Sequence, residues 1–168
     1  RNLLGHEEAN SSEFDESTPH PCVLFMPEVS ATVMGGTMRL GSRCTIIRDP
    51  MNTLAGKVYS GQPVIYERHR HRYEVNSAYV QGLENKGLKF SGQDERGQRM
   101  EIIELEDHPF FFAVQFHPEF KSRPNRPSPC FLAFILASGS NLNTRLEEDG
   151  GKLNIGAGFE KPVQVSKE

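Results

Sequence analysis

A histidine and a carboxylate stand two residues apart at His117-Pro118-Glu119. They follow residues 110–116 (FFFAVQF), the most apolar run of the chain, which predicts a strand buried on both faces. Functional groups of open α/β sheets gather at the carboxyl ends of strands. A histidine there can act as a general base, and the carboxylate can fix its tautomer and stabilise its protonated form. The alternative is that both side chains only form hydrogen bonds with backbone groups at a turn. A motif of three residues is too short to distinguish the catalytic interpretation from this structural one.

A second candidate is the basic run at residues 68–72, Arg-His-Arg-His-Arg. In an extended conformation, alternation places the arginines on one face and the histidines on the other. An arginine fork could bind a ligand carboxylate through two hydrogen bonds. A solvated strand edge and a surface phosphate patch are the alternatives. His69 and His71 could also begin a zinc site by their spacing, but no CxxC or HExxH motif completes one, so we expect no metal.

The cysteines Cys22, Cys44 and Cys130 are odd in number and widely spaced, which is typical of free thiols in a reducing compartment. Cys130 follows Ser-Pro at a predicted helix start, where a thiolate is favoured. None of the three has the flanking glycines of a nucleophile elbow. The glycine-rich residues 34–41 (MGGTMRLG) lack the Gly-Lys-Ser/Thr of a phosphate loop, and a tight hairpin connection explains them equally well.

The elements that must position these groups alternate between strands and helices. Apolar and β-branched runs predict strands at residues 22–26, 45–47, 64–75, 88–91 and 100–105, the last two as a hairpin. A short helix capped by Asn76 or Ser77 should end at Gly87. A second, apolar helix is predicted over residues 130–137. This order predicts a layered α/β domain.

Composition limits the possible classes of protein. The 168 residues suit one domain, but a hydrophobic fraction of 36% is low, so part of the chain should lie outside a core. We expect a folded region at 1–143 and a flexible C-terminal tail at 144–168, where glycine and charge replace the apolar pattern. A net charge of −3 argues against a nucleic-acid partner. The polar N-terminus and the lack of a long apolar run predict a cytoplasmic protein without membrane contact.

Five segments carry a family resemblance: ANSSEF (9–14), MGGTMRLG (34–41), ERHRHRYEVN (67–76), GLKFSGQD (87–94) and EIIELEDHPFFFAVQFHPEFKSRP (101–124). In this order they closely resemble the C-terminal glutamine amidotransferase domain of the CTP synthase family. The resemblance runs from the first residue to about residue 140. The segments RHRHRYEVN and MGGTMRLG are typical of that family rather than of amidotransferases at large.

The resemblance implies an incomplete class I glutamine amidotransferase fold: a flavodoxin-like layered sheet with helices and a β-hairpin region. It also implies a Cys-His-Glu triad, in which cysteine attacks the glutamine amide, forms a thioester and releases ammonia. On the family's pattern His117 is the base and Glu119 its orienting carboxylate. Glu13 matches the residue that holds the amino group of glutamine. Arg72, with Tyr73 beside it, matches the residue that binds the glutamine carboxylate.

The resemblance also implies partners. The segment should bind glutamine and no cofactor, while ATP and Mg would bind in a separate synthase domain that converts UTP to CTP, in an enzyme that is a homotetramer. The chain does not begin with Met, and the family's Gly-x-Cys-x-Gly elbow is absent from it. We therefore expect a fragment of a CTP synthase that is inactive alone. The alternatives are a non-catalytic remnant acting as a binding or assembly protein and, more weakly, a nucleic-acid module using the basic run.

Overall fold

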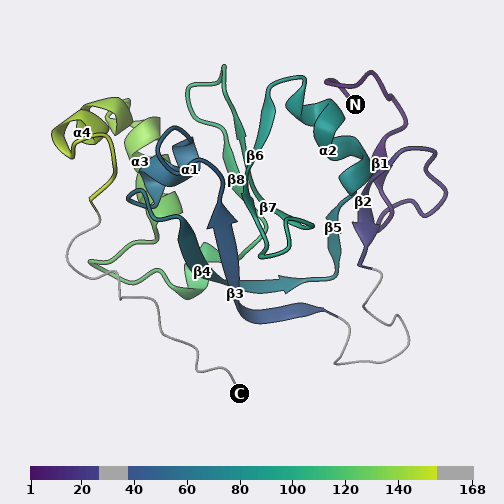
Figure 1. The fold of residues 1–168 in the computed structure, drawn as a ribbon, viewed down its shortest axis with the longest axis horizontal. Coiled ribbons are helices and arrows are strands. Elements are labelled where there is room, and N and C mark those ends of the chain that lie inside the picture. Colours follow the sequence, from purple (N-terminus) through teal and green to yellow (C-terminus); the bar gives the residue numbers. More distant parts are fainter. Residues whose placement is uncertain (27–37, 155–168) are drawn as a thin grey trace.

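The computed structural model describes residues 1–26 and 38–154, which form two sheets with helices packed around them (Figure 1). Among these residues the larger sheet has the order β4-β3-β6-β7-β8, and all its pairings are antiparallel. Its strands are β3 (Arg39–Ile47), β4 (Val64–His71), β6 (Leu88–Gln93), β7 (Met100–Leu105) and β8 (Phe112–Val114). The predicted hairpin is confirmed as β6 and β7.

The smaller sheet joins three short strands that are distant in sequence: β1 (Asn10–Ser11), β2 (Pro21–Phe25) and β5 (Tyr73–Val75). β1 and β2 are parallel, while β2 and β5 are antiparallel. Only Arg72 separates β4 from β5, and its carbonyl accepts a hydrogen bond from the Met26 N–H at 2.9 Å. The extended run predicted at 64–75 is thus present, and it serves both sheets.

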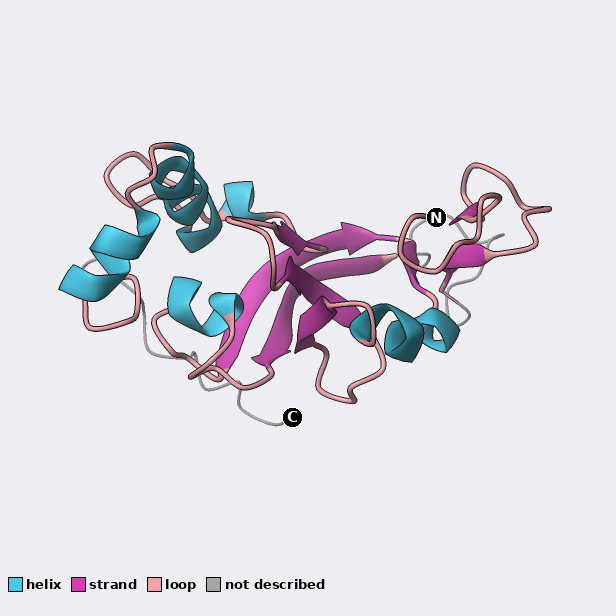
Figure 2. Cartoon of the chain, turned by 90° about the horizontal axis from the view of Figure 1, so that it is seen from above, coloured by secondary structure: helices cyan, strands magenta, loops and turns pink. Residues whose placement is uncertain are grey.

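Helices lie on both sides of the larger sheet (Figure 2). They are α1 (Leu54–Val58), α2 (Ser77–Glu84), the 3-10 helix η1 (Pro118–Phe120), α3 (Pro129–Ser138) and α4 (Leu142–Glu148). α2 begins as predicted, because the Asn76 side chain accepts a hydrogen bond from the Ala78 N–H at 3.0 Å. α2 packs on β6, whereas α1 contacts β6, β7 and α3. None of the helices in the described ranges is both long enough and apolar enough to cross a membrane.

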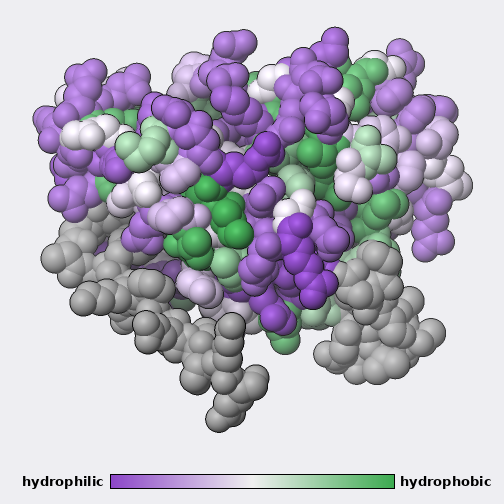
Figure 3. Space-filling model, in the orientation of Figure 1, coloured by the Kyte–Doolittle hydropathy of each residue, from purple (hydrophilic) through white to green (hydrophobic). Residues whose placement is uncertain are grey.

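The main core lies between the larger sheet and α1, α3 and α4. Its buried members are Ile47, Ala55, Val58, Tyr59, Ile65, Ile102, Phe116, Cys130, Ala133, Leu142 and Leu153. Hydrophilic side chains dominate the face in Figure 3, with apolar side chains exposed between them. β3 and β4 contribute to the exposed apolar surface through Leu40, Val64 and Tyr66.

The layered α/β class is confirmed, but two expectations differ from the structure. Residues 110–116 are not a strand buried on both faces, because only Phe112–Val114 pair, at an edge of the sheet, with Ala113 exposed. The flexible tail expected from residue 144 is not seen over residues 144–154, since α4 covers Leu142–Glu148 and Leu153 is buried. Residues 155–168 and the predicted turn at 34–37 lie outside the described residues.

Candidate active site

The His117–Glu119 pair lies just beyond β8. Gln115 extends the pairing with β7 by donating its N–H to the Glu101 carbonyl at 2.9 Å, and Pro118 then begins η1. The tight turn brings His117 Nδ1 within 2.7 Å of Glu119 Oε1. The predicted hydrogen bond between these side chains is confirmed. With the proton on Nδ1, the imidazole donates to Glu119 and presents Nε2 as an acceptor.

The electrostatics of the pair suit a general base. Hydrogen bonds from the Glu119 backbone N–H and from His117 lower the pKa of the Glu119 carboxyl, so this group is ionised at neutral pH. The His117 side chain is 39% exposed and that of Glu119 is 53% exposed, so the pair lies at the surface. An imidazole held this way can accept a proton from a thiol, hydroxyl or water.

β4 confirms the predicted alternation of its basic residues. Glu67 and His69 point into the protein, while Arg68 and Arg70 are exposed. Arg72 lies beyond the end of β4 and is also exposed. The run therefore does not present its three arginines from one strand, because the chain leaves the larger sheet at Arg72.

The two histidines of this run are neutral. Burial, followed by repulsion from His71 when that residue is protonated, lowers the pKa of His69 to about 3. Burial, followed by the nearby arginine Arg39, lowers the pKa of His71 to about 4. In the part of the chain that the structure describes, no three His, Cys, Asp or Glu side chains are grouped so that they could hold a metal ion.

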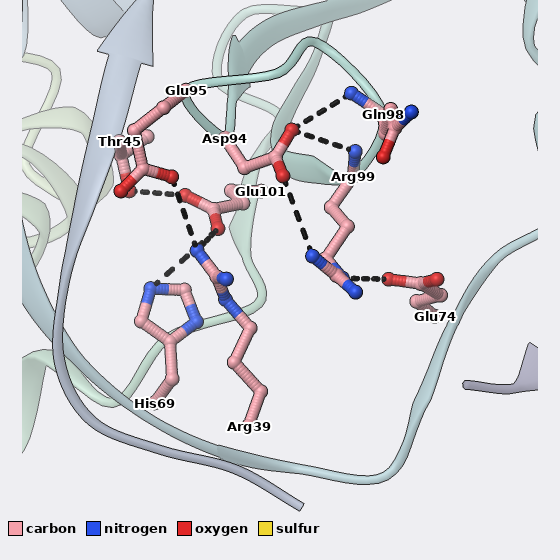
Figure 4. A network of polar contacts seen from close by, with 9 residues as sticks. All are labelled: Arg39, Thr45, His69, Glu74, Asp94, Glu95, Gln98, Arg99 and Glu101. Carbon is pink, nitrogen blue, oxygen red and sulfur yellow. Dashed lines mark hydrogen bonds and ion pairs between the residues drawn. The ribbon is translucent and has the colours of Figure 1, made fainter. Parts of the chain in front are cut away.

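A buried ion-pair network, which the sequence did not predict, lies behind these histidines (Figure 4). Arg39 Nη2 lies 2.8 Å from Glu101 Oε1, and the Thr45 hydroxyl donates to the other oxygen of Glu101. His69 Nε2 is 3.9 Å from Glu101 Oε1. Burial raises the pKa of Glu101, and the Thr45 and Arg39 contacts oppose that rise. The sequence signal of this network is a charged residue, Glu101, within the otherwise largely apolar strand β7.

The same network continues from the β6–β7 hairpin to the smaller sheet. Asp94 Oδ1 accepts the backbone N–H groups of Gln98 and Arg99 at 2.7 and 3.0 Å, which shapes the turn. The Arg99 guanidinium lies 3.4 Å from Asp94 and 2.8 Å from Glu74 of β5. Arg99 therefore connects the hairpin to the strand that carries Tyr73 (Figure 4).

The predicted glutamine-binding residues gather at the smaller sheet. Glu13 is exposed in the turn after β1, where its N–H donates to Ser11 Oγ at 3.2 Å. The Tyr73 ring packs edge-on against Phe25 of β2 at 5.4 Å, next to Arg72. Within the described residues no hydrogen bond or ion pair joins Glu13 or Arg72 to His117. Their convergence on one substrate stays a prediction.

The structure makes Cys130 a poor nucleophile. Its side chain is buried and Sγ lies 3.1 Å from the Tyr59 hydroxyl. Burial raises the Cys130 pKa to about 11, so the thiolate expected at this helix start is wrong: desolvation outweighs the helix terminus. Burial also raises the pKa of Cys44. All three cysteines are free thiols.

Comparison with known proteins shows which family the chain belongs to. The chain matches the class-I glutamine amidotransferase family over residues 21–137. It is 56% identical to CTP synthase 2 of Xenopus laevis over 154 residues, which are 92% of the chain and 26% of that protein. It is 53% identical to CTP synthase 1 of Homo sapiens over 148 residues, 88% of the chain and 25% of that protein. CTP synthase of Archaeoglobus fulgidus is 55% identical over 150 residues, 89% of the chain and 27% of that protein.

A solved structure has the same fold. The glutaminase domain of Trypanosoma brucei CTPS, with bound acivicin, superposes with a TM-score of 0.76 at 39% identity, over 83% of this chain and 54% of that one. The chain spans about a quarter of the length of the curated relatives. The resemblance seen in the sequence is confirmed, and the chain belongs to the class-I glutamine amidotransferase family.

Proposed function

We propose that the chain is the glutamine-hydrolysing part of a CTP synthase, which releases ammonia for the ATP-dependent amination of UTP to CTP. The observation that carries this proposal is the 2.7 Å contact between His117 and Glu119, in a chain 53–56% identical to CTP synthases. A histidine held by a carboxylate is the part of a thiol-based triad that moves protons.

His117 would act twice in the reaction. Nε2 first accepts the proton of a cysteine thiol, whose sulfur attacks the side-chain amide carbon of glutamine. The imidazolium then gives its proton to the leaving nitrogen, so that ammonia departs and a thioester remains. Water, deprotonated by the same nitrogen, hydrolyses the thioester to glutamate and regenerates the thiol. The nucleophile is a cysteine other than Cys22, Cys44 and Cys130.

Substrate recognition would use opposite charges at the two ends of glutamine. The Glu13 carboxylate would bind the amino group, and the Arg72 guanidinium, with Tyr73 beside it, would bind the carboxylate through two hydrogen bonds. The exposure of Glu13 and Arg72 and their common attachment to the smaller sheet support this assignment.

The remaining length of the protein would supply the other half of the reaction. The chain covers about a quarter of its relatives, which leaves room for a synthase domain that binds ATP, Mg and UTP and receives the ammonia. We assign no residue of this chain to ATP or Mg. The family resemblance further supports a homotetramer, and the free cysteines support a cytoplasmic location.

The test compares two nitrogen sources in the full-length protein that contains this chain. With His117→Ala, glutamine-dependent CTP formation should fall by about 10³-fold or more, because the triad base is lost. CTP formation from added ammonia should stay near the unmodified level, since it bypasses the thioester. Arg72→Ala should weaken only the glutamine-dependent reaction. Equal loss of both activities, or no loss in either, would contradict the proposal.

A further inference from the structure

The segment that carries His117 and Glu119 is fastened to β4 at both of its ends. The His117 N–H donates to the Arg68 carbonyl at 2.8 Å. Lys121, which follows η1, donates from Nζ to the Tyr66 carbonyl at 2.5 Å and lies 3.5 Å from Glu67 Oε1. Three consecutive residues of β4 therefore hold the turn from one end to the other.

Glu67 is an unusual residue for this position, because it is 1% exposed. The Tyr59 hydroxyl donates to its Oε1 at 3.4 Å, and its Oε2 has no hydrogen-bond partner among the described residues. Burial raises the pKa of Glu67, and Lys121 is the strongest opposing influence. A buried carboxylate is costly unless a cation compensates it, so the carboxylate draws Lys121 toward β4.

The other side of Glu67 reaches the residue before His117. Tyr59, which bonds Glu67, packs edge-on against the Phe116 ring at 6.4 Å. The Tyr59 hydroxyl also contacts Cys130 Sγ of α3 at 3.1 Å, so two partners hold the hydroxyl end of this side chain. Glu67 thus influences the chain before His117 through Tyr59 and the chain after it through Lys121.

We propose that Glu67 and Lys121 are positioning residues for glutamine hydrolysis: their ion pair holds η1 on β4 and so fixes His117 Nε2 relative to the nucleophile and the substrate. This inference rests on the proposed function. Neither residue touches the reacting atoms. Proton transfer from a thiol needs exact placement of the imidazole, and a displacement of about 1 Å can cost about 10²-fold in rate.

The decisive variant is Lys121→Met in the full-length protein, which keeps most of the side-chain stem and removes the charge. We expect kcat of glutamine-dependent CTP formation to fall about tenfold. The KM for glutamine and the ammonia-dependent rate should not change. Lys121→Arg, which retains the charge, should restore most of kcat. A purely structural role would instead lower both activities together.

Lys89→Met is the matched control. Lys89 is 43% exposed against 44% for Lys121 and also pairs with a glutamate, Glu106, but it lies on β6 away from η1. This variant should behave like the unmodified protein in both reactions. Equal losses of kcat in Lys89→Met and Lys121→Met would overturn the inference.

A double variant tests whether Glu67 and Lys121 act as one pair. Glu67→Gln should lower kcat in the same way, and adding Lys121→Met to it should cost much less than Lys121→Met alone. Fully additive losses, or an unchanged kcat in Lys121→Met, would overturn the inference. His117→Ala in the same assay separates the two proposals: if it also leaves the glutamine-dependent rate intact, the proposed function itself has failed.

Discussion

The two regions proposed to handle glutamine are built differently. The His117–Glu119 pair is exposed and its members are two residues apart, so one turn of chain forms it. The ion-pair network that reaches β5, the strand of Tyr73, is largely buried and joins distant segments, with Arg39 and Glu101 62 residues apart. The first region can lose a side chain without disturbing the core, whereas the second is part of the core. Substitutions in the first region should therefore lower activity with little effect on stability, and substitutions in the second should mainly lower stability.

Glu119→Gln should give the largest effect, and it should fall on activity alone. The amide cannot stabilise the imidazolium and favours the wrong tautomer, so glutamine-dependent CTP formation should drop about 10³-fold. Because Glu119 is half exposed, the urea midpoint of unfolding should hardly move. Steady-state kinetics and urea titration of the full-length protein measure the two quantities. A large drop in stability would show that the two regions are not separable.

Glu101→Ala should show the opposite pattern, with its main effect on stability. The change leaves the Arg39 guanidinium buried without its 2.8 Å partner and removes the acceptor of the Thr45 hydroxyl. The free energy of unfolding should fall by about 3–5 kcal/mol. Arg39→Met added to Glu101→Ala should recover part of the loss, because it removes the uncompensated charge. An unchanged urea midpoint in Glu101→Ala would mean that this network does not stabilise the fold.

A smaller effect is expected from pH. The pKa of His69 is about 3 in the folded protein, below its ordinary value near 6.5, so between these values the unfolded chain binds a proton that the folded chain does not. The contribution of His69 to the free energy of unfolding should be fully present above about pH 6.5. Below that pH it should decline by up to about 1.4 kcal/mol per pH unit. His69→Phe should reduce the slope, while His71, with a pKa of about 4, keeps part of it. Urea titrations at several pH values measure the slope, and equal slopes in both proteins would contradict the assignment.

Local patterns in the sequence were sufficient for much of the fold. The alternation in β4, the Asn76 cap of α2 and the contact between His117 and Glu119 each depend on residues within a few positions of one another. Helix α1 was not predicted, because it is only five residues long. Its start is fixed by a capping hydrogen bond from the Gly56 N–H to Thr53 Oγ1 at 3.2 Å. Such a short helix leaves almost no periodic signal.

The features that the sequence did not predict share a physical cause, which is contact between distant segments of the chain. The pairing of Tyr59 with Cys130, 71 residues apart, depends on how α3 packs against the sheet, and that packing buries the thiol. Leu153 is buried because its N–H donates to the Lys57 carbonyl at 2.8 Å, which ties the chain after α4 to α1. The glycine-rich, charged sequence around Leu153 gives no sign of this second contact.

The alternation of β4 has a consequence for insertions and deletions. Each residue of this strand either faces the core or faces out, and the Arg68 carbonyl also binds the His117 N–H. Deleting a single residue within β4 would exchange the two faces, sending Arg68 and Arg70 into the interior and Glu67 and His69 out. The strand should therefore accept many substitutions on its outer face while tolerating no change in length, so natural length variation among related chains should be confined to the loops on either side of it.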